Sequence, residues 1–205
     1  MNWKFLLLHP QGIIALQERN VIFIELLCMA VLAIPFFIIL IYIVRKYRAK
    51  NNSTYEPELT GSTKKQILLW IPAILLVLVL IVIIWRSTYA VDPYKSIDSP
   101  NPPITVEVVA LQWKWLFIYP DQNIATVNFV EFPVNTQVKF VLTADAPMNS
   151  FTIPELGGQM YAMAAMTTHL NLIANHIGEF RGQAVEISGP GFSGMNFIAK
   201  SVTED

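Results

Sequence analysis

The stretch VIFIELLCMAVLAIPFFIILIYIV, residues 21–44, decides the fold of this 205-residue chain. Its only charge is Glu25 and its only proline is Pro35. At about 1.5 Å per residue, a helix of this length is roughly 36 Å long, enough to cross a hydrocarbon layer of about 30 Å with some tilt. Such a helix is apolar on every face, as lipid requires. We therefore predict a membrane-spanning helix over residues 21–44, after an outer segment of residues 1–20.

A second apolar run, ILLWIPAILLVLVLIVIIW, occupies residues 67–85 and contains no charge. It predicts a second spanning helix over residues 67–86. Two buried helices of a soluble core are the alternative, but the rest of the chain is too short to cover them. The two runs also explain why 54% of the chain is apolar and only 14% is charged.

The charges around these runs predict an orientation. The loop of residues 45–66 carries six basic and two acidic residues, whereas the chain after the second run carries six basic and eleven acidic residues. Short loops rich in lysine and arginine stay in the cytoplasm. We therefore expect a cytoplasmic loop, with both termini on the outer side.

After the second run the composition changes. Residues 87–103 form a connector rich in proline and aspartate, and short alternating apolar segments follow from residue 104. Several such strands without a helical period indicate an all-β sandwich or Greek-key barrel over residues 104–205. We expect the strands in ITVEVVALQWKWLFIYP, ATVNFVEFPVN, TQVKFVLTA, NSFTIPELG, THLNLIAN and MNFIAKSV.

Reactive groups are few. The single cysteine, Cys28, excludes an internal disulfide and any site built on two thiolates. His9, His169 and His176 are scattered, and none has a second ligand at metal spacing. A net charge of −1 provides no basic field for nucleic acid.

Residues 189–194, GPGFSG, match G-x-G-x-x-G letter for letter. A dinucleotide site also needs a helix after the motif and an acidic residue about 20 positions further on, and this chain offers neither. Ser193 lacks the closing glycine of a nucleophile elbow. We therefore predict a tight turn here.

The order of these parts, together with QWKW at residues 112–115 and IYP at residues 118–120, resembles subunit II of the haem-copper terminal oxidases. EVVALQWKWLFIYP, NSFTIPELGGQMYAM and SGPGFSGMNFIA resemble, in order and spacing, the cytochrome bo-type ubiquinol oxidase branch. The resemblance implies two transmembrane α-helices in a hairpin, followed by a cupredoxin-like barrel or sandwich.

The cytochrome c oxidase branch holds a binuclear copper centre in the same barrel. By resemblance, Asn149 occupies its first histidine position, Ser188 and Phe192 its cysteine positions, Asn196 its second histidine position and Ala199 its methionine position. Neither a hydroxyl nor a phenyl group replaces the soft thiolates that a copper pair requires. We therefore expect no metal ligand, cofactor site or catalytic residue in this chain.

The resemblance then implies a non-redox structural subunit of a proton-pumping oxidase. Its partner subunit I would hold two haems and one copper, oxidise ubiquinol and reduce oxygen to water. Further small membrane subunits and lipid would complete the assembly in a bacterial inner membrane, with the β domain in the periplasm.

Three residues are candidates for subunit contact. Trp113 and Trp115 stand two apart in a predicted strand, which places them on one face, and we expect that face to pack in the core or against another subunit. Glu25 is an acid within the first apolar run, near its outer end, where its carboxyl group could extend to the membrane surface, stay protonated or bond to another membrane subunit.

A second group concerns protons. The family tends to place an acid at the cytoplasmic start of the second helix, near the mouth of a proton channel, and Gln66 occupies that position here. A neutral amide cannot titrate, so Glu56 or Glu58 would have to substitute in any proton uptake.

Two other functions stay open from the sequence. The first is a cytochrome c oxidase subunit II with an electron-accepting copper site, which the missing ligands disfavour. The second is a free-standing, membrane-anchored cupredoxin-like binding module, which would purify without a haem-bearing partner.

Overall fold

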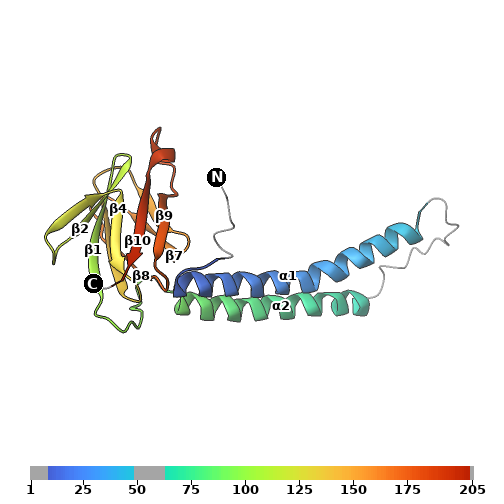
Figure 1. The fold of residues 1–205 in the computed structure, drawn as a ribbon. Helices are drawn as coiled ribbons and strands as arrows, with labels where there is room; N and C mark the ends of the chain where they lie inside the picture. Colours follow the sequence, from blue (N-terminus) through green and yellow to red (C-terminus); the bar gives the residue numbers. More distant parts are fainter. Residues whose placement is uncertain (1–8, 49–62, 204–205) are drawn as a thin grey trace. The chain divides into compact units, whose positions relative to one another are not determined.

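The computed structural model describes residues 9–48 and 63–203 (Figure 1). The chain divides into two compact units. One is helical and comprises residues 20–90. The other combines the segment up to Arg19 with Val91–Asp205 and contains all the described strands.

The helices are α1 (Ile13–Lys46) and α2 (Thr63–Ala90), which run antiparallel in Figure 1. Both are long and apolar enough to cross a membrane. α1 begins inside the segment predicted to precede it, because residues 13–20, IIALQERN, include several good helix formers and no proline or glycine. It continues through Pro35 and bends in its second half, as a proline inside a helix explains.

The two helices meet along one narrow seam. Partly buried residues recur at alternating spacings of three and four, the pattern of two helices packed along one stripe. The seam residues are Val21, Glu25, Cys28 and Leu32 on α1, and Ala73, Leu76, Leu80, Ile83 and Ser87 on α2. The other faces stay open, with Leu27 67% and Leu68 69% exposed.

The strands build a sandwich of two five-stranded sheets in the described residues, ordered β3-β2-β1-β5-β8 and β4-β10-β9-β6-β7. In chain order they are β1 (Ile104–Leu111), β2 (Lys114–Tyr119), β3 (Ile124–Val127), β4 (Phe129–Pro133), β5 (Gln137–Ala144), β6 (Asn149–Ile153), β7 (Gly157–Ala162), β8 (Thr168–Ile173), β9 (Gly178–Ala184) and β10 (Asn196–Val202). The predicted fold class, two apolar helices followed by an all-β domain, is confirmed.

Single residues in the left-handed region divide the first two predicted strand segments. Trp113, with φ of 64°, turns the chain between β1 and β2, and Asn128, with φ of 54°, separates β3 from β4 in the other sheet. Two strands, β7 and β9, are absent from the predicted set, since the glycines in GGQMYA and GEFRGQA weaken the strand pattern.

Aromatic rings fill the space between the sheets. Phe151 of β6 stacks on Phe197 of β10 with ring centroids 4.9 Å apart, and the indole of Trp115 meets Phe151 edge-on at 5.3 Å. Gly182 of β9 makes room for this packing, because a Cβ there would lie 1.9 Å from the Phe197 ring.

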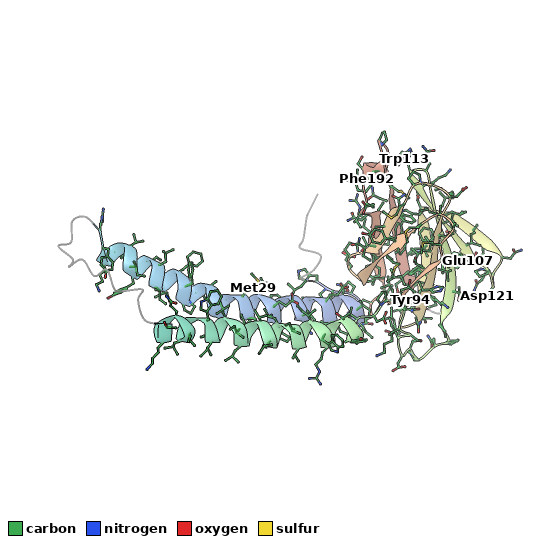
Figure 2. The ribbon with its side chains drawn as sticks, turned by 180° about the vertical axis from the view of Figure 1, so that it is seen from behind. Met29, Tyr94, Glu107, Trp113, Asp121 and Phe192 are labelled. Atoms are coloured by element: carbon green, nitrogen blue, oxygen red, sulfur yellow. The ribbon has the colours of Figure 1, made fainter. Side chains whose placement is uncertain are left out.

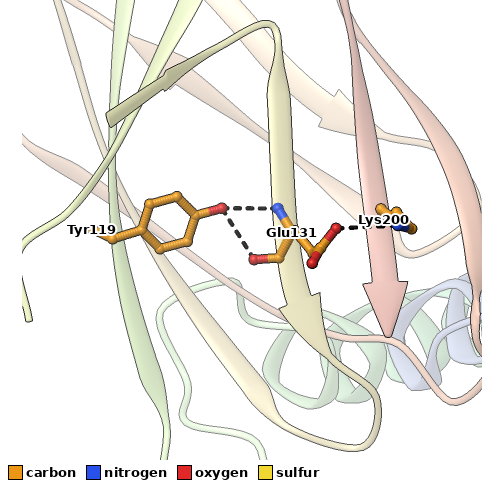
Figure 3. A network of polar contacts seen from close by, with 3 residues as sticks. All are labelled: Tyr119, Glu131 and Lys200. Atoms are coloured by element: carbon orange, nitrogen blue, oxygen red, sulfur yellow. Dashed lines mark hydrogen bonds and ion pairs between the residues drawn. The ribbon is translucent and has the colours of Figure 1, made fainter. Parts of the chain in front are cut away.

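A tyrosine links the sheets near one edge (Figure 3). The Tyr119 hydroxyl donates to the Glu131 carbonyl at 3.0 Å and accepts from the Glu131 N–H at 2.8 Å. Burial raises the pKa of Tyr119 above its usual value of 10.0. The Glu131 carboxylate also pairs with Lys200 at 3.3 Å, but both side chains are about 40% exposed, so this ion pair adds little.

The start of α1 is bonded to the β6–β7 turn. Gln11 N–H donates to the Glu155 carbonyl at 2.8 Å, and Ala15 N–H donates to the Leu156 carbonyl at 3.1 Å. The Glu18 carboxylate accepts from the Gly158 N–H at 3.0 Å. The Ala15 bond satisfies a backbone donor that a helix start leaves without a partner, and the three bonds together make this end of α1 part of the β unit.

Two buried amides hold the connector. Asn171 donates to the Pro93 carbonyl from both its backbone and its side chain, at 3.0 and 3.1 Å. The Gln137 side-chain oxygen accepts from Ser96 and from the Ile97 N–H, and its nitrogen donates to Asn171 at 2.9 Å. The chain entering β1 is therefore fixed on the sandwich.

Replacing Gly157 by alanine should destabilise the β unit by roughly 1–3 kcal/mol. Gly157 has φ of 92°, and a Cβ there would lie 2.5 Å from the Ala15 nitrogen. The measurement is urea unfolding of the full chain in detergent, followed by near-UV circular dichroism. Gly178→Ala is the control, because its Cβ would meet only the Phe180 ring at 3.7 Å. Equal stability of the two variants would contradict the close packing of the start of α1 on the β6–β7 turn.

Replacing Tyr119 by phenylalanine should cost roughly 1–2 kcal/mol at pH 7, because the Glu131 backbone groups lose their partner. The folded chain holds the phenol proton more tightly than the unfolded chain does. The wild-type advantage is therefore complete below about pH 10 and is lost as the pH rises through the folded-state pKa. Unfolding of both proteins between pH 7 and pH 11 tests this. The control Tyr161→Phe, at a side chain that is 42% exposed, should change the free energy of unfolding little. A stability difference between wild type and Tyr119→Phe that stays constant with pH would refute the role assigned to the Tyr119 hydroxyl.

Candidate functional site

Two of the five positions that the resemblance assigns to copper ligands meet at one end of the sandwich. Asn149 opens β6 and is only 2% exposed, and Ser188 lies in the segment after β9. The Ser188 hydroxyl donates to Asn149 Oδ1 at 2.8 Å. Asn149 Nδ2 in turn donates to the Pro147 carbonyl at 2.9 Å. The two side chains therefore use their polar atoms on the protein itself.

Trp113 covers this pair from the β1–β2 turn. A Cβ on Gly189 would lie 2.5 Å from its indole, and one on Gly191 would lie 2.4 Å away, so only glycines admit the ring. Figure 2 shows Trp113 and Phe192 at the same end of the β unit. A cavity of about 250 Å³ lies here, lined by Gln112, Trp113, Ala146, Pro147, Asn149, Ser188 and Pro190.

The other three positions are engaged elsewhere. Phe192 opens a short 3-10 turn, η3 (Phe192–Gly194), and packs against the core. Asn196 Nδ2 donates to the Ser193 carbonyl at 3.3 Å, and Ala199 is fully buried in β10. Among the hydrogen bonds of the described residues, only the one between Ser188 and Asn149 joins two of the five side chains.

This donor set does not fit a copper pair. Phe192 and Ala199 carry no donor atom, and Asn149 and Ser188 are bonded to each other. Hydroxyl and amide oxygens are hard ligands, whereas the copper centre of the related branch requires bridging thiolates.

The glycine motif is a turn, as predicted. Phe192 N–H donates to the Gly189 carbonyl at 3.2 Å, and η3 follows directly. The glycines of the motif therefore form the surface against which the Trp113 indole packs. We missed this role, although its signal, glycines two apart in SGPG, was visible.

The prediction of one shared strand face for the two tryptophans is wrong. Trp113 lies in the turn, because its backbone is in the left-handed region, and only Trp115 belongs to β2. Trp115 is fully buried in the core, so it cannot contact another subunit at the surface. Trp113 keeps a partly exposed edge.

The remaining candidates are spread over the chain. Glu25 lies on the seam between α1 and α2 and is partly buried there, and Gln66 is in the first turn of α2. His169 is in β8, at the edge of its sheet. Glu56 and Glu58 lie outside the described residues.

Comparison with known proteins assigns the chain to a family. A family model described as "Cytochrome C oxidase subunit II, periplasmic domain" matches residues 122–202. A protein of Buchnera aphidicola subsp. Schizaphis graminum, named cytochrome bo(3) ubiquinol oxidase subunit 2, is 44% identical over 96% of this chain and 68% of its own length. The chain belongs to the ubiquinol oxidase subunit 2 family. The relative of the same name from Pseudomonas putida is 48% identical over the whole chain, which spans 65% of that protein's length.

Solved structures share the fold of this family member. The periplasmic domain of subunit II of the Bradyrhizobium japonicum cytochrome oxidase superposes with a TM-score of 0.50 at 20% identity, covering 54% of this chain and 89% of that one. A chain of a heme-copper terminal oxidase dimer gives 0.52 at 12% identity, covering 68% and 99%. The cupredoxin-like expectation for the β domain is confirmed.

Restoring the five ligand types should create a copper site if the loops keep the geometry of the copper branch. The variant combines Asn149→His, Ser188→Cys, Phe192→Cys, Asn196→His and Ala199→Met. We expect purple absorbance and about two coppers per chain, the stoichiometry of a thiolate-bridged pair. The matched control keeps Phe192 and therefore supplies only one thiolate, so it should lack the colour. A folded five-fold variant without copper would show that the loops have a different geometry.

Proposed function

We propose that this chain is the non-redox, structural subunit II of a proton-pumping ubiquinol oxidase. The observation that carries the proposal is the pair Asn149 and Ser188, bonded to each other where the copper branch has a histidine and a cysteine. The family to which the chain belongs points the same way. Since ubiquinol reaches the enzyme within the membrane, no copper relay from a soluble donor is needed.

The chemistry would then reside in partner subunit I. That subunit would hold two haems and one copper, oxidise ubiquinol and reduce oxygen to water, with further small membrane subunits beside it. This chain would bind subunit I through its helices and cover the outer surface with the β sandwich. The open apolar faces of α1 and α2 support this role, because their seam leaves most of each helix for lipid and partner helices.

The proposed topology places the spans at residues 21–44 and 67–86, with the loop of residues 45–66 in the cytoplasm. The segment of residues 1–20, the connector of residues 87–103 and the domain of residues 104–205 would lie in the periplasm of a bacterial inner membrane. Arg45 and Lys46 in the last turn of α1 support this orientation.

Trp113 is the residue we propose for subunit contact at the outer surface, since its indole covers the loop end of the sandwich. Glu25 would act from the helix seam, where a carboxyl group needs a polar partner or a proton. For proton uptake, Gln66 offers only a neutral amide, and Glu56 or Glu58 would supply the acid.

Purification through a tag on this chain tests the proposal. In mild detergent, we expect a larger haem-bearing polypeptide to co-purify, with one copper per complex. The measurement combines an optical spectrum with a metal count. About two further coppers per chain would establish an electron-accepting subunit instead, and a chain without haem would indicate a free-standing, membrane-anchored module.

A further inference from the structure

Two loops of the sandwich meet at the former copper position, and something other than a metal must hold them together. The first loop joins β5 to β6, and the second joins β9 to β10. The last backbone bond that the described residues show between β6 and the second loop is Val185 N–H to the Ser150 carbonyl, at 3.1 Å. Beyond it the chain leaves the sheet and rejoins it only at β10, after η3.

The Ser188–Asn149 hydrogen bond joins the two loops past that point. Its partners are 39 residues apart in the chain. Asn149 is almost fully buried, and its amide is also bonded to Pro147 of its own loop. Burial strengthens such a bond and makes its loss expensive, because an unpaired buried amide stays desolvated.

The Trp113 indole covers the same loop from a third part of the chain. It packs against Gly189 and Gly191 on either side of Pro190, so the loop cannot lift without losing this contact. The left-handed backbone of Trp113 aims the ring at the loop instead of along β2. The Ser188–Asn149 hydrogen bond and the Trp113 ring therefore both hold the short segment of residues 188–191.

We propose that Asn149 and Ser188, covered by Trp113, form a metal-free cross-link that closes these loops in place of the copper pair. The inference rests on the proposed function, because it presumes that no copper binds here. The cross-link fixes the loop end of the sandwich, and with it the exposed edge of Trp113, in one conformation.

Hydrogen exchange of the purified full-length complex tests the cross-link. Ser188→Ala should speed amide exchange in residues 186–195 by about fivefold to tenfold, the effect of losing one partly buried hydrogen bond. Asn149→Ala should do the same, and the double variant should exchange no faster than the faster single variant. Ser193→Ala is the matched control, the same substitution at an exposed site in the same loop.

Unchanged exchange in Ser188→Ala, or additive effects in the double variant, would overturn the cross-link. Ser188→Ala removes one oxygen from a partly exposed site, so it decides the question even if Asn149→Ala fails to fold. Gly191→Ala tests the packing of Trp113 on the loop separately, because its Cβ would lie 2.4 Å from the indole. Gly194→Ala is the control, because its Cβ would meet nothing within 4 Å. Faster exchange in the first variant only is expected, and equal exchange in both would remove Trp113 from the proposal.

The same preparation separates the two proposals. Copper bound to the wild-type β unit would overturn the proposed function and the cross-link together. If the complex contains haem and no copper in the β unit, but Ser188→Ala leaves amide exchange in the loop unchanged, only the cross-link is overturned.

Discussion

Burial of β6 along its whole length constrains the rest of the β unit. All five residues of Asn149–Ile153 are buried, and Phe151 is at the centre of the aromatic core. One end of the strand carries Asn149 and its bond to Ser188, and the other leads into the turn that receives α1. A shift of this strand would disturb the core, the loop end and the helix junction at once.

The loop end of the sandwich keeps its fold without the donor atoms that a copper pair needs. A copper pair depends on donor atoms, and the five positions here have none that suit it. The conformation of the two loops needs only a contact that holds them together. The Ser188–Asn149 hydrogen bond and the Trp113 indole, packed on two glycines, can provide it. The cupredoxin-like fold therefore does not require copper ligands at these positions.

The sequence was enough to predict the helices and the sandwich, because the run at residues 21–44 and the strand alternation are local patterns. It was not enough where one residue changes the chain direction. Trp113 and Asn128 have left-handed backbones that no alternation reveals, so two predicted strand segments were really four strands. At the site, the ligand positions followed from resemblance, but the bond between Asn149 and Ser188 joins residues whose contact only the folded chain creates. The early start of α1 was missed because the prediction followed the apolar run alone, although residues 13–20 include good helix formers. The bonds of this helix end to the β6–β7 turn and β7 are visible only in the folded chain.

The junction at the start of α1 also affects the order in which the chain can mature. Glu18 finds its backbone partner, Gly158, 140 residues later in the chain. A ribosome therefore releases α1, α2 and most of the strands before the first turn of α1 can bind its acceptor turn. Synthesis from the N-terminus thus leaves this helix end without its final contacts until the β6–β7 turn has been made. Completion of the β unit is in this way a late step in the maturation of the chain.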